Sequence, residues 1–302
     1  MAGITPRARA WRCLWAAWLC VVPLSAAAQD TPAQDKPIGE APEERDAGDI
    51  FLRGQRVLLG RGDIVVDVGQ FYGRSDDLQL AVVNNALTLA TREQTVLTTV
   101  LFGRVGVLNE TEVFAGTAFH HQTNRLFFGG TDLSSKGRSD FRGVSVGVRR
   151  TFLREAAGRP DVIGTFDAQI PTGDTAYVLG GGLVLVKSID PVVLFAGVNY
   201  HRSLRRDLVD GTRLEPGNRV DVSLGYALAV NDTLAISTAA SGLFTRAATG
   251  DDAASQRIDV FSLRFALTSS LAKGLYIEPS VSVGLSGPGH SFSLGVTVPY
   301  SF

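Results

Sequence analysis

Residues Asn218 to Val230 read NRVDVSLGYALAV and show the clearest structural pattern in the chain. Every second residue from Val220 onward is a valine, a leucine or a tyrosine, whereas Arg219, Asp221 and small residues stand between them. An alternation with a period of two places all the apolar side chains on one face of a β-strand. One face of this strand therefore suits lipid and the other suits water.

The same alternation recurs along the chain in segments of about ten residues, the length that a tilted strand needs to span a membrane. It predicts strands at residues 62–73, 93–107, 111–121, 139–153, 159–171, 176–188, 190–201, 218–230, 233–244, 257–271, 274–285 and 290–302. Because a bilayer tolerates only helices and closed barrels, we expect an all-β protein, a transmembrane antiparallel up-and-down β-barrel of about 12 strands. A soluble periplasmic β-sandwich also alternates, and stays open as an alternative.

The connections between the predicted strands alternate in length, which supports this arrangement. The compact ones are residues 108–110, 188–190, 231–232 and 272–274, and the long polar ones are residues 74–92, 121–138, 201–217 and 245–256. An even strand number with short turns at one end predicts that both termini face the periplasm and that the long loops face outward. Pro279 and Pro299 fall inside predicted strands, where a missing backbone donor predicts a bulge or a displaced strand boundary.

Aromatic residues on the apolar face fall near the strand ends, as expected of side chains that prefer the membrane interface. One predicted girdle comprises Tyr72, Phe119, Tyr200 and Phe261, and the other comprises Phe152, Tyr226, Tyr300 and Phe302. The last segment alternates from Phe292 to a terminal phenylalanine, which resembles the closing strand of outer-membrane barrels. We therefore expect Tyr300 and Phe302 to form an assembly signal for the outer-membrane barrel assembly machinery.

The N-terminal residues predict export. Arg7, Arg9 and Arg12 precede a short apolar run that ends in small residues at Ala26–Ala28. This order is typical of a secretory signal peptide, which we expect to comprise residues 1–28 and to be cleaved after Ala28. The polar residues 29–50 predict a disordered periplasmic leader, and residues 51–302 the barrel domain.

Composition excludes several classes of function. Both cysteines and all three tryptophans lie within the predicted signal, so stability cannot come from disulfides. Removing three arginines from the 29 basic residues leaves 26 against 30 acidic ones, a net charge of −4, which argues against nucleic acid as a partner. No motif points to a cofactor or a metal, and we expect neither.

Several stretches resemble the outer-membrane protein family of the phenol-degradation meta-pathway, whose members are small barrels described as transporters. The matching pieces are residues 56–59, 101–107, 110–113, 140–150, 158–160, 171–174 and 190–200, in this order along the chain. The resemblance implies a barrel with a transport role for small, hydrophobic or aromatic molecules. It supplies no binding residues.

The water-facing positions of the predicted strands carry charges of both signs. The expected lumen-lining residues are Asp67, Arg104, Glu112, Asp167, Lys187, Arg219, Asp221, Arg264 and Glu278. In a channel such charges select permeants, whereas in a sealed structural or adhesive barrel they would only pair with one another. A barrel of 12 strands lies between filled and water-filled barrels, so both outcomes are physical. We favour a narrow channel for an unknown small-molecule permeant.

Two further predictions concern the outer rim. A phospholipase-like enzyme would need a histidine such as His120 or His201 beside a serine such as Ser203 or Ser291. No segment resembles the nucleophile motif of that class, so we expect no catalytic residue. We expect outer-membrane lipid and lipopolysaccharide as partners, with their phosphates near arginines at residues 202, 205 and 206.

Overall fold

A computed structural model describes residues 58–83, 86–129, 131–172, 176–207, 213–214, 216–247, 257–286 and 290–302. The predicted signal peptide, its cleavage site and the leader at residues 29–50 lie outside these residues. No helix in the described part of the chain is long and apolar enough to cross a membrane.

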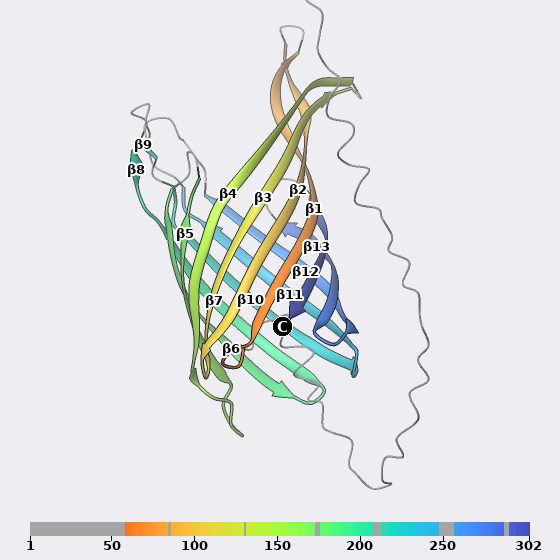
Figure 1. Cartoon of the computed structure of the whole chain (residues 1–302). Helices are drawn as coiled ribbons and strands as arrows, with labels where there is room; N and C mark the ends of the chain where they lie inside the picture. The colour runs from red at the N-terminus through yellow and green to blue at the C-terminus, as the bar shows by residue number, and fades with distance from the viewer. Residues whose placement is uncertain are drawn as a thin grey trace, which may run out of the picture. The chain divides into compact units, whose positions relative to one another are not determined.

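The strands form a closed antiparallel barrel (Figure 1), as the alternation predicts. Each barrel strand pairs with its neighbour along the chain, and β1 closes the barrel by pairing with β14. A small hairpin of β8 and β9 lies between β7 and β10 in the chain. The strands are β1 (Ile64–Val83), β2 (Ala86–Leu108), β3 (Thr111–Phe128), β4 (Thr131–Leu153), β5 (Asp161–Ile170), β6 (Val178–Ile189), β7 (Val192–Ser203), β8 (Arg206–Asp207), β9 (Arg213–Leu214), β10 (Arg219–Asn231), β11 (Leu234–Thr245), β12 (Ile258–Ala272), β13 (Leu275–Ser286) and β14 (His290–Ser301).

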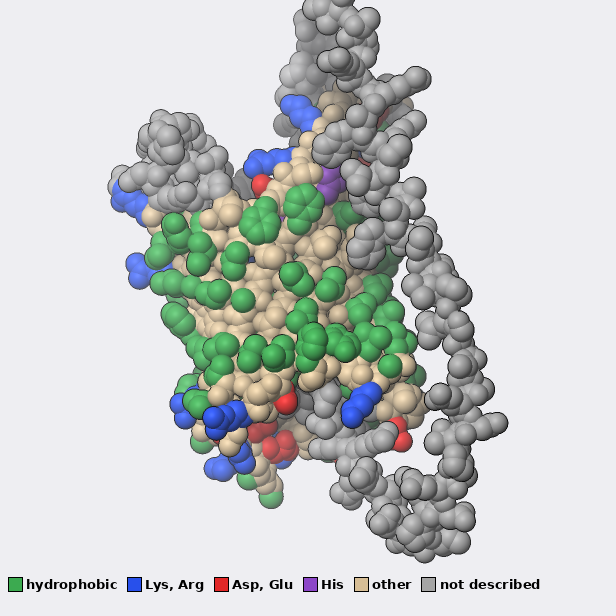
Figure 2. All heavy atoms as spheres, in the orientation of Figure 1, with side chains coloured by type: hydrophobic (Ala, Val, Ile, Leu, Met, Phe, Trp, Pro, Cys, Tyr) green, Lys and Arg blue, Asp and Glu red, His purple; other side chains and the backbone are tan. Residues whose placement is uncertain are grey.

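The barrel has two distinct ends, which we name by their contents. The terminal end holds Ile64 and Phe302, whose backbone groups are hydrogen-bonded to each other, and the loop end is opposite. In β10, Leu224 and Tyr226 point outward and are exposed, while Ala227 is buried inside. Hydrophobic side chains cover the outer wall between charged groups at the two ends (Figure 2). The wall is therefore apolar outside, as lipid requires.

All eight aromatic residues expected at the girdles are exposed on the outward face. Some of them pack edge against face: the rings of Tyr300 and Phe302 are 4.7 Å apart, and those of Phe244 and Phe261 are 5.4 Å apart. Tilted or perpendicular ring pairs are the arrangement that aromatic quadrupoles favour. Whether Tyr300 and Phe302 also act as an assembly signal stays a prediction.

The first four strands are much longer than predicted. They have 20, 23, 18 and 23 residues, whereas β5 to β7 have 10 to 12. Their outer portions, residues 74–83, 86–93, 118–129 and 131–143, rise beyond the rest of the barrel in Figure 1, and we call them the extension. The prediction of long loops at residues 74–92 and 121–138 is therefore wrong, because most of these residues pair as hairpins. Both faces of a sheet outside the membrane meet water, so the alternation that marks a strand fades at residues 121–138. It persists at Leu78, Leu80 and Val82, where it was overlooked.

The extension has two edges without a partner strand in the described part of the chain. Pairing of β1 with β14 ends at Asp76 and His290, and pairing of β4 with β5 ends at Val144 and Ile170. Gly143 marks the second point, with a φ of 91°. A Cβ at this residue would lie 2.1 Å from the carbonyl oxygen of Ile170, so only glycine lets β4 bend away here.

The two strand prolines do not form bulges. The paired residues of β13 and β14 keep one register on both sides of Pro299, and those of β12 and β13 keep one register on both sides of Pro279. The strand pairing is merely interrupted beside each proline, which is the expected effect of a missing backbone N–H donor. The predicted bulges are therefore wrong, while the strand boundaries are close to those expected.

The interior near the terminal end is filled by apolar side chains. The cluster comprises Ile163, Val184, Val186, Val193, Phe195, Ala227 and Ala235, which lie on β5, β6, β7, β10 and β11. Leu58 packs against this cluster, and Leu59 is buried. The segment that precedes β1 therefore turns into the barrel rather than away from it. Gly106 of β2 permits this approach, because a Cβ there would lie 1.9 Å from the carbonyl oxygen of Gly60.

Candidate functional site: the charged lumen

Above the apolar cluster, the lumen contains four groups of paired charges. The first group joins β1 to β2, with Asp67 Oδ2 3.6 Å from Arg104 Nε. Both side chains are on the inward face of their strands, as the alternation predicts. The side chain of Arg104 is almost entirely buried.

The second group joins β3 to β4 and is the most deeply buried. Arg149 donates a hydrogen bond to Glu112 Oε1 at 3.0 Å, and the backbone N–H of Leu59 donates to Oε2 at 3.3 Å. The Glu112 side chain has no exposed surface. The Arg149 guanidinium lies over the ring of Phe114, 4.6 Å from its centroid, a cation–π contact. Glu112 thus ties the incoming N-terminal segment to the barrel wall.

The third group lies nearer the loop end and joins β5, β7 and β10. His201 lies between two aspartates, with Nδ1 2.9 Å from Asp221 Oδ2 and Nε2 3.6 Å from Asp167 Oδ1. Arg219 donates to the same Asp221 oxygen at 3.1 Å. The fourth group joins β12 to β13, where Arg264 donates to Glu278 Oε1 at 2.8 Å and Thr268 to Oε2 at 3.3 Å.

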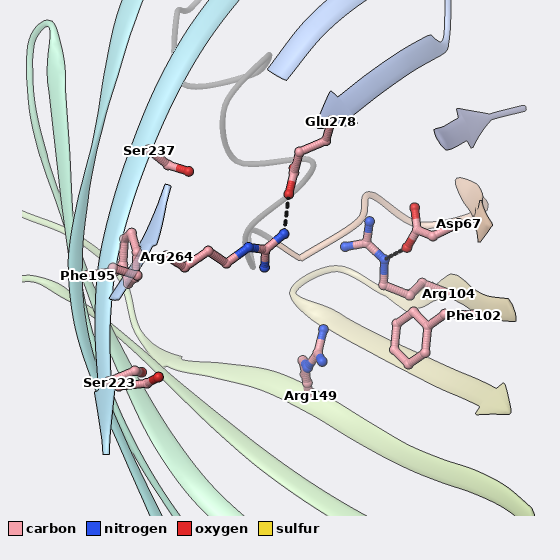
Figure 3. A pocket seen from close by; sticks show the side chains of 11 residues that line it. Asp67, Phe102, Arg104, Arg149, Phe195, Ser223, Ser237, Arg264 and Glu278 are labelled. Carbon is pink, nitrogen blue, oxygen red and sulfur yellow. Dashed lines mark hydrogen bonds and ion pairs between the residues drawn. The ribbon is translucent and has the colours of Figure 1, made fainter. Parts of the chain in front are cut away.

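These groups border internal cavities. A cavity of about 400 Å³ lies among residues of eight strands, and a second of about 240 Å³ includes Asp167 and His201 in its lining. Arg149 lines both of them. Figure 3 shows the guanidinium groups of Arg104, Arg149 and Arg264 directed into the larger cavity from different sides. Its lining comprises Asp67, Phe102, Arg104, Arg149, Phe195, Ser223, Ser237, Ala239, Ser241, Arg264 and Glu278.

The structure thus brings eight of the nine expected lumen residues to the inner face and places Lys187 elsewhere. Lys187 continues the outward row of Leu183 and Leu185 in β6, and its Nζ lies 2.8 Å from Glu155 in the connection between β4 and β5. Burial acts in the opposite sense, but hydrogen bonds from Lys187 and Ser188 hold the pKa of the Glu155 carboxyl below its usual value. The pair fastens a turn at the terminal end and does not line the lumen.

Sequence reasoning missed Arg149 and His201 as lumen residues. The alternation alone could have identified both residues. Val144 and Val146 are exposed on the outward face and Val148 continues their row, so the side chain of Arg149, the next residue, faces inward. The adjacent Arg150 is equally basic, so only the register distinguishes the two arginines. His201 follows Tyr200 on the outward face in the same way.

The phospholipase-like alternative requires a histidine beside a serine, and Ser203 and His120 have other partners. The Ser203 hydroxyl donates to the Gly217 carbonyl at 3.2 Å, while His120 Nδ1 lies 3.0 Å from the hydroxyl of Thr98. His121 Nδ1 does lie 2.9 Å from Ser139 Oγ on the outward face of the extension. Among the described residues, however, no carboxylate is hydrogen-bonded to His121 to orient it as a general base.

The fold is that of solved outer-membrane proteins. An outer membrane channel from Pseudomonas putida F1, termed COG4313, matches with a TM-score of 0.60 and 11% identity over 82% of this chain and 98% of that one. The translocator domain of the autotransporter NalP from Neisseria meningitidis matches with a TM-score of 0.53 and 12% identity over 81% and 90%. No protein-family model matches the chain. At these identities the likeness shows the barrel architecture alone.

Proposed function

We propose that this protein is an outer-membrane channel for passive or facilitated passage of small molecules. The observation that carries the proposal is the cavity of about 400 Å³ inside the barrel, lined by polar and charged side chains from strands all around the wall. A purely structural barrel of this width has no need of such a space, because apolar side chains could fill it, as they do near the terminal end.

The permeants that fit the resemblance to the phenol-degradation family are small, and hydrophobic or aromatic. Phe102 and Phe195 supply apolar surface inside the cavity. The segment at Leu58 and Leu59 narrows the terminal end, so passage is through a restricted path and conductance should be small. In this proposal the terminal end faces the periplasm and the loop end faces the exterior.

The same proposal places the outward face against outer-membrane lipid and lipopolysaccharide. Arg202 follows the girdle residue Tyr200 on the outward face of β7 and is exposed. A guanidinium directly beyond an aromatic girdle is well placed for a lipid phosphate. The barrel assembly machinery would recognise Tyr300 and Phe302 during insertion of the barrel into the membrane.

The test of the channel is the current across a planar lipid bilayer that contains the purified protein. We expect discrete conductance steps. Replacing Arg264 by alanine should change the anion-to-cation selectivity, measured as the reversal potential in a salt gradient, because Arg264 lines the cavity. Arg257→Ala is the matched control, since Arg257 precedes the same strand and is exposed where it pairs with Asp259. A barrel without current, in a preparation shown to be folded, would defeat the channel and favour a sealed barrel.

A further inference from the structure

Two ion pairs in the larger cavity expose their two partners unequally. The side chain of Glu278 is 8% exposed, whereas that of its partner Arg264 is 39% exposed. The side chain of Glu112 is fully buried, whereas that of its partner Arg149 is 20% exposed. In both pairs the carboxylate is withdrawn into the wall and the guanidinium faces the space. The third pair of this cavity has the opposite bias, because the side chain of Asp67 is 18% exposed and that of Arg104 is 4% exposed. Three arginines and two carboxylates line the cavity, since Glu112 lies behind the wall, so the lining carries a net positive charge.

The buried carboxylates also have protein donors other than the arginines. Glu112 accepts a hydrogen bond from the backbone of Leu59, and Glu278 accepts one from the hydroxyl of Thr268. Each guanidinium has five N–H groups, of which one in Arg149 and one in Arg264 donates to its carboxylate partner. With respect to the described residues, both arginines therefore have further donors for a ligand in the cavity, in the planar arrangement that matches a carboxylate.

Aromatic surface lies in the same space. Phe102 on β2 and Phe195 on β7 line opposite sides of the cavity in Figure 3. The volume of about 400 Å³ falls within the usual range of small-molecule pockets, about 300–1,000 Å³. Positive charge and aromatic walls together favour a ligand that has both a ring and an anionic group.

We infer that the larger cavity is a binding site for small aromatic carboxylates, which are held by Arg149 and Arg264 with their rings against Phe102 or Phe195. The inference rests on the proposed channel and names the class of permeant that it selects. A neutral aromatic hydrocarbon would displace water from the guanidinium groups without replacing its hydrogen bonds, which is unfavourable. An aromatic cation would be repelled by the exposed face of both pairs.

The probes are benzoate, benzyl alcohol and benzylammonium, which share a ring and differ in charge. Binding to the detergent-solubilised full chain is measured by isothermal titration calorimetry, and block of the current is measured in the planar bilayer. We expect benzoate to bind at least about tenfold more tightly than either other probe, a difference of about 1.4 kcal/mol. Equal affinity for benzoate and benzylammonium would overturn the inference.

The deciding variant is the double substitution Arg264→Gln with Glu278→Gln, which removes both charges and keeps groups that can hydrogen-bond to each other. We expect benzoate affinity to fall about tenfold or more. The matched control is Arg257→Gln with Asp259→Asn, an exposed pair at the start of the same strand, which should leave affinity unchanged. Unchanged affinity in the lumen variant would refute the site.

Two further results keep the inference separate from the channel proposal and from misfolding. If the double variant does not fold, Arg264→Lys keeps the charge and loses the planar fork, and should weaken benzoate binding measurably. An unchanged affinity in this variant counts against the site. Benzoate binding without any current would refute the channel and support the binding site. Current without benzoate binding would support the channel and refute the binding site.

Discussion

The lumen and the extension use the same kinds of ion pair but bury them to different degrees. In the lumen, Glu112 is fully buried beside Arg149, which is 20% exposed. In the extension, the pair of Arg138 and Asp140 has side chains that are 79% and 36% exposed. Solvent can replace a lost partner in the extension, whereas nothing replaces it in the lumen. Burial, more than the number of ion pairs, therefore decides where the stability of this barrel depends on charge.

The largest expected effect is that of Arg149→Leu. It leaves Glu112 buried without its cationic partner, which costs about 3–5 kcal/mol in the free energy of unfolding. Urea unfolding followed by circular dichroism measures the loss. The control is Arg150→Leu, because Arg150 is exposed on the outward face. Adding Glu112→Gln to Arg149→Leu should restore much of the stability, since the amide oxygen can still accept from Leu59. Equal losses at both arginines would remove the distinction between buried and exposed charge.

A second test contrasts two glycines. A Cβ at Gly106 would collide with the backbone of Gly60, whereas one at Gly137 in the extension would have no atom within 4 Å. Gly106→Ala should therefore destabilise the protein by about 1–3 kcal/mol. It should also push the segment at Leu59 away from the wall and change the single-channel conductance. If Gly137→Ala changed the conductance equally, the segment at Leu59 would not control the passage of ions through the barrel.

A smaller loss is expected from Arg74→Ala in the extension. Arg74 pairs with Glu93 at 2.9 Å and with Asp76 at 3.4 Å, and the side chains of Arg74 and Asp76 are 41% and 42% exposed. Removing the exposed arginine therefore lets water reach the carboxylates that it paired with. The expected loss in the same urea assay is much smaller than that of Arg149→Leu, and it should shrink at high salt. A loss as large as that of Arg149→Leu would show that the extension is as dependent on its charges as the lumen.

The smallest effect is expected from shortening the first hairpin. Asp76 and Glu93 are direct partners across β1 and β2, so residues 77–92 can be replaced by an asparagine–glycine turn. We expect the barrel to keep its unfolding midpoint and its conductance, because the removed residues lie beyond the pairing of β1 with β14. A barrel that fails to assemble after this deletion would show that the extension is needed for folding.

The barrel was predictable because lipid imposes a rule on the sequence. The alternation from Val220 to Val230 reappears in the structure with Leu224 outside and Ala227 inside. The same rule places Asp67, Arg104, Glu112 and the six other expected residues in strands, because each strand has one face in hydrocarbon. The strand count follows from counting such segments.

The extension and the pairing of charges in the lumen were harder to predict from the sequence, for a physical reason. Beyond the membrane both faces of a strand meet water, so residues 121–128 and 131–138 show no apolar face and resemble a loop. Pairing between side chains, such as that of Arg149 with Glu112, depends on which strands are neighbours and on their register. The turn of Leu58 and Leu59 into the lumen depends on contacts with residues distant in the sequence, such as Gly106, and no local pattern encodes it.

The open edge of β4 beyond Gly143 has a consequence for the behaviour of many copies in one membrane. Unpaired backbone groups along a strand are a template on which another chain can add, which leads to aggregation. Here the edge carries Lys136, Arg138 and Asp140 in place of a flat apolar surface. Such charged side chains make docking of an identical edge unfavourable, so crowded copies are kept from joining into a continuous sheet.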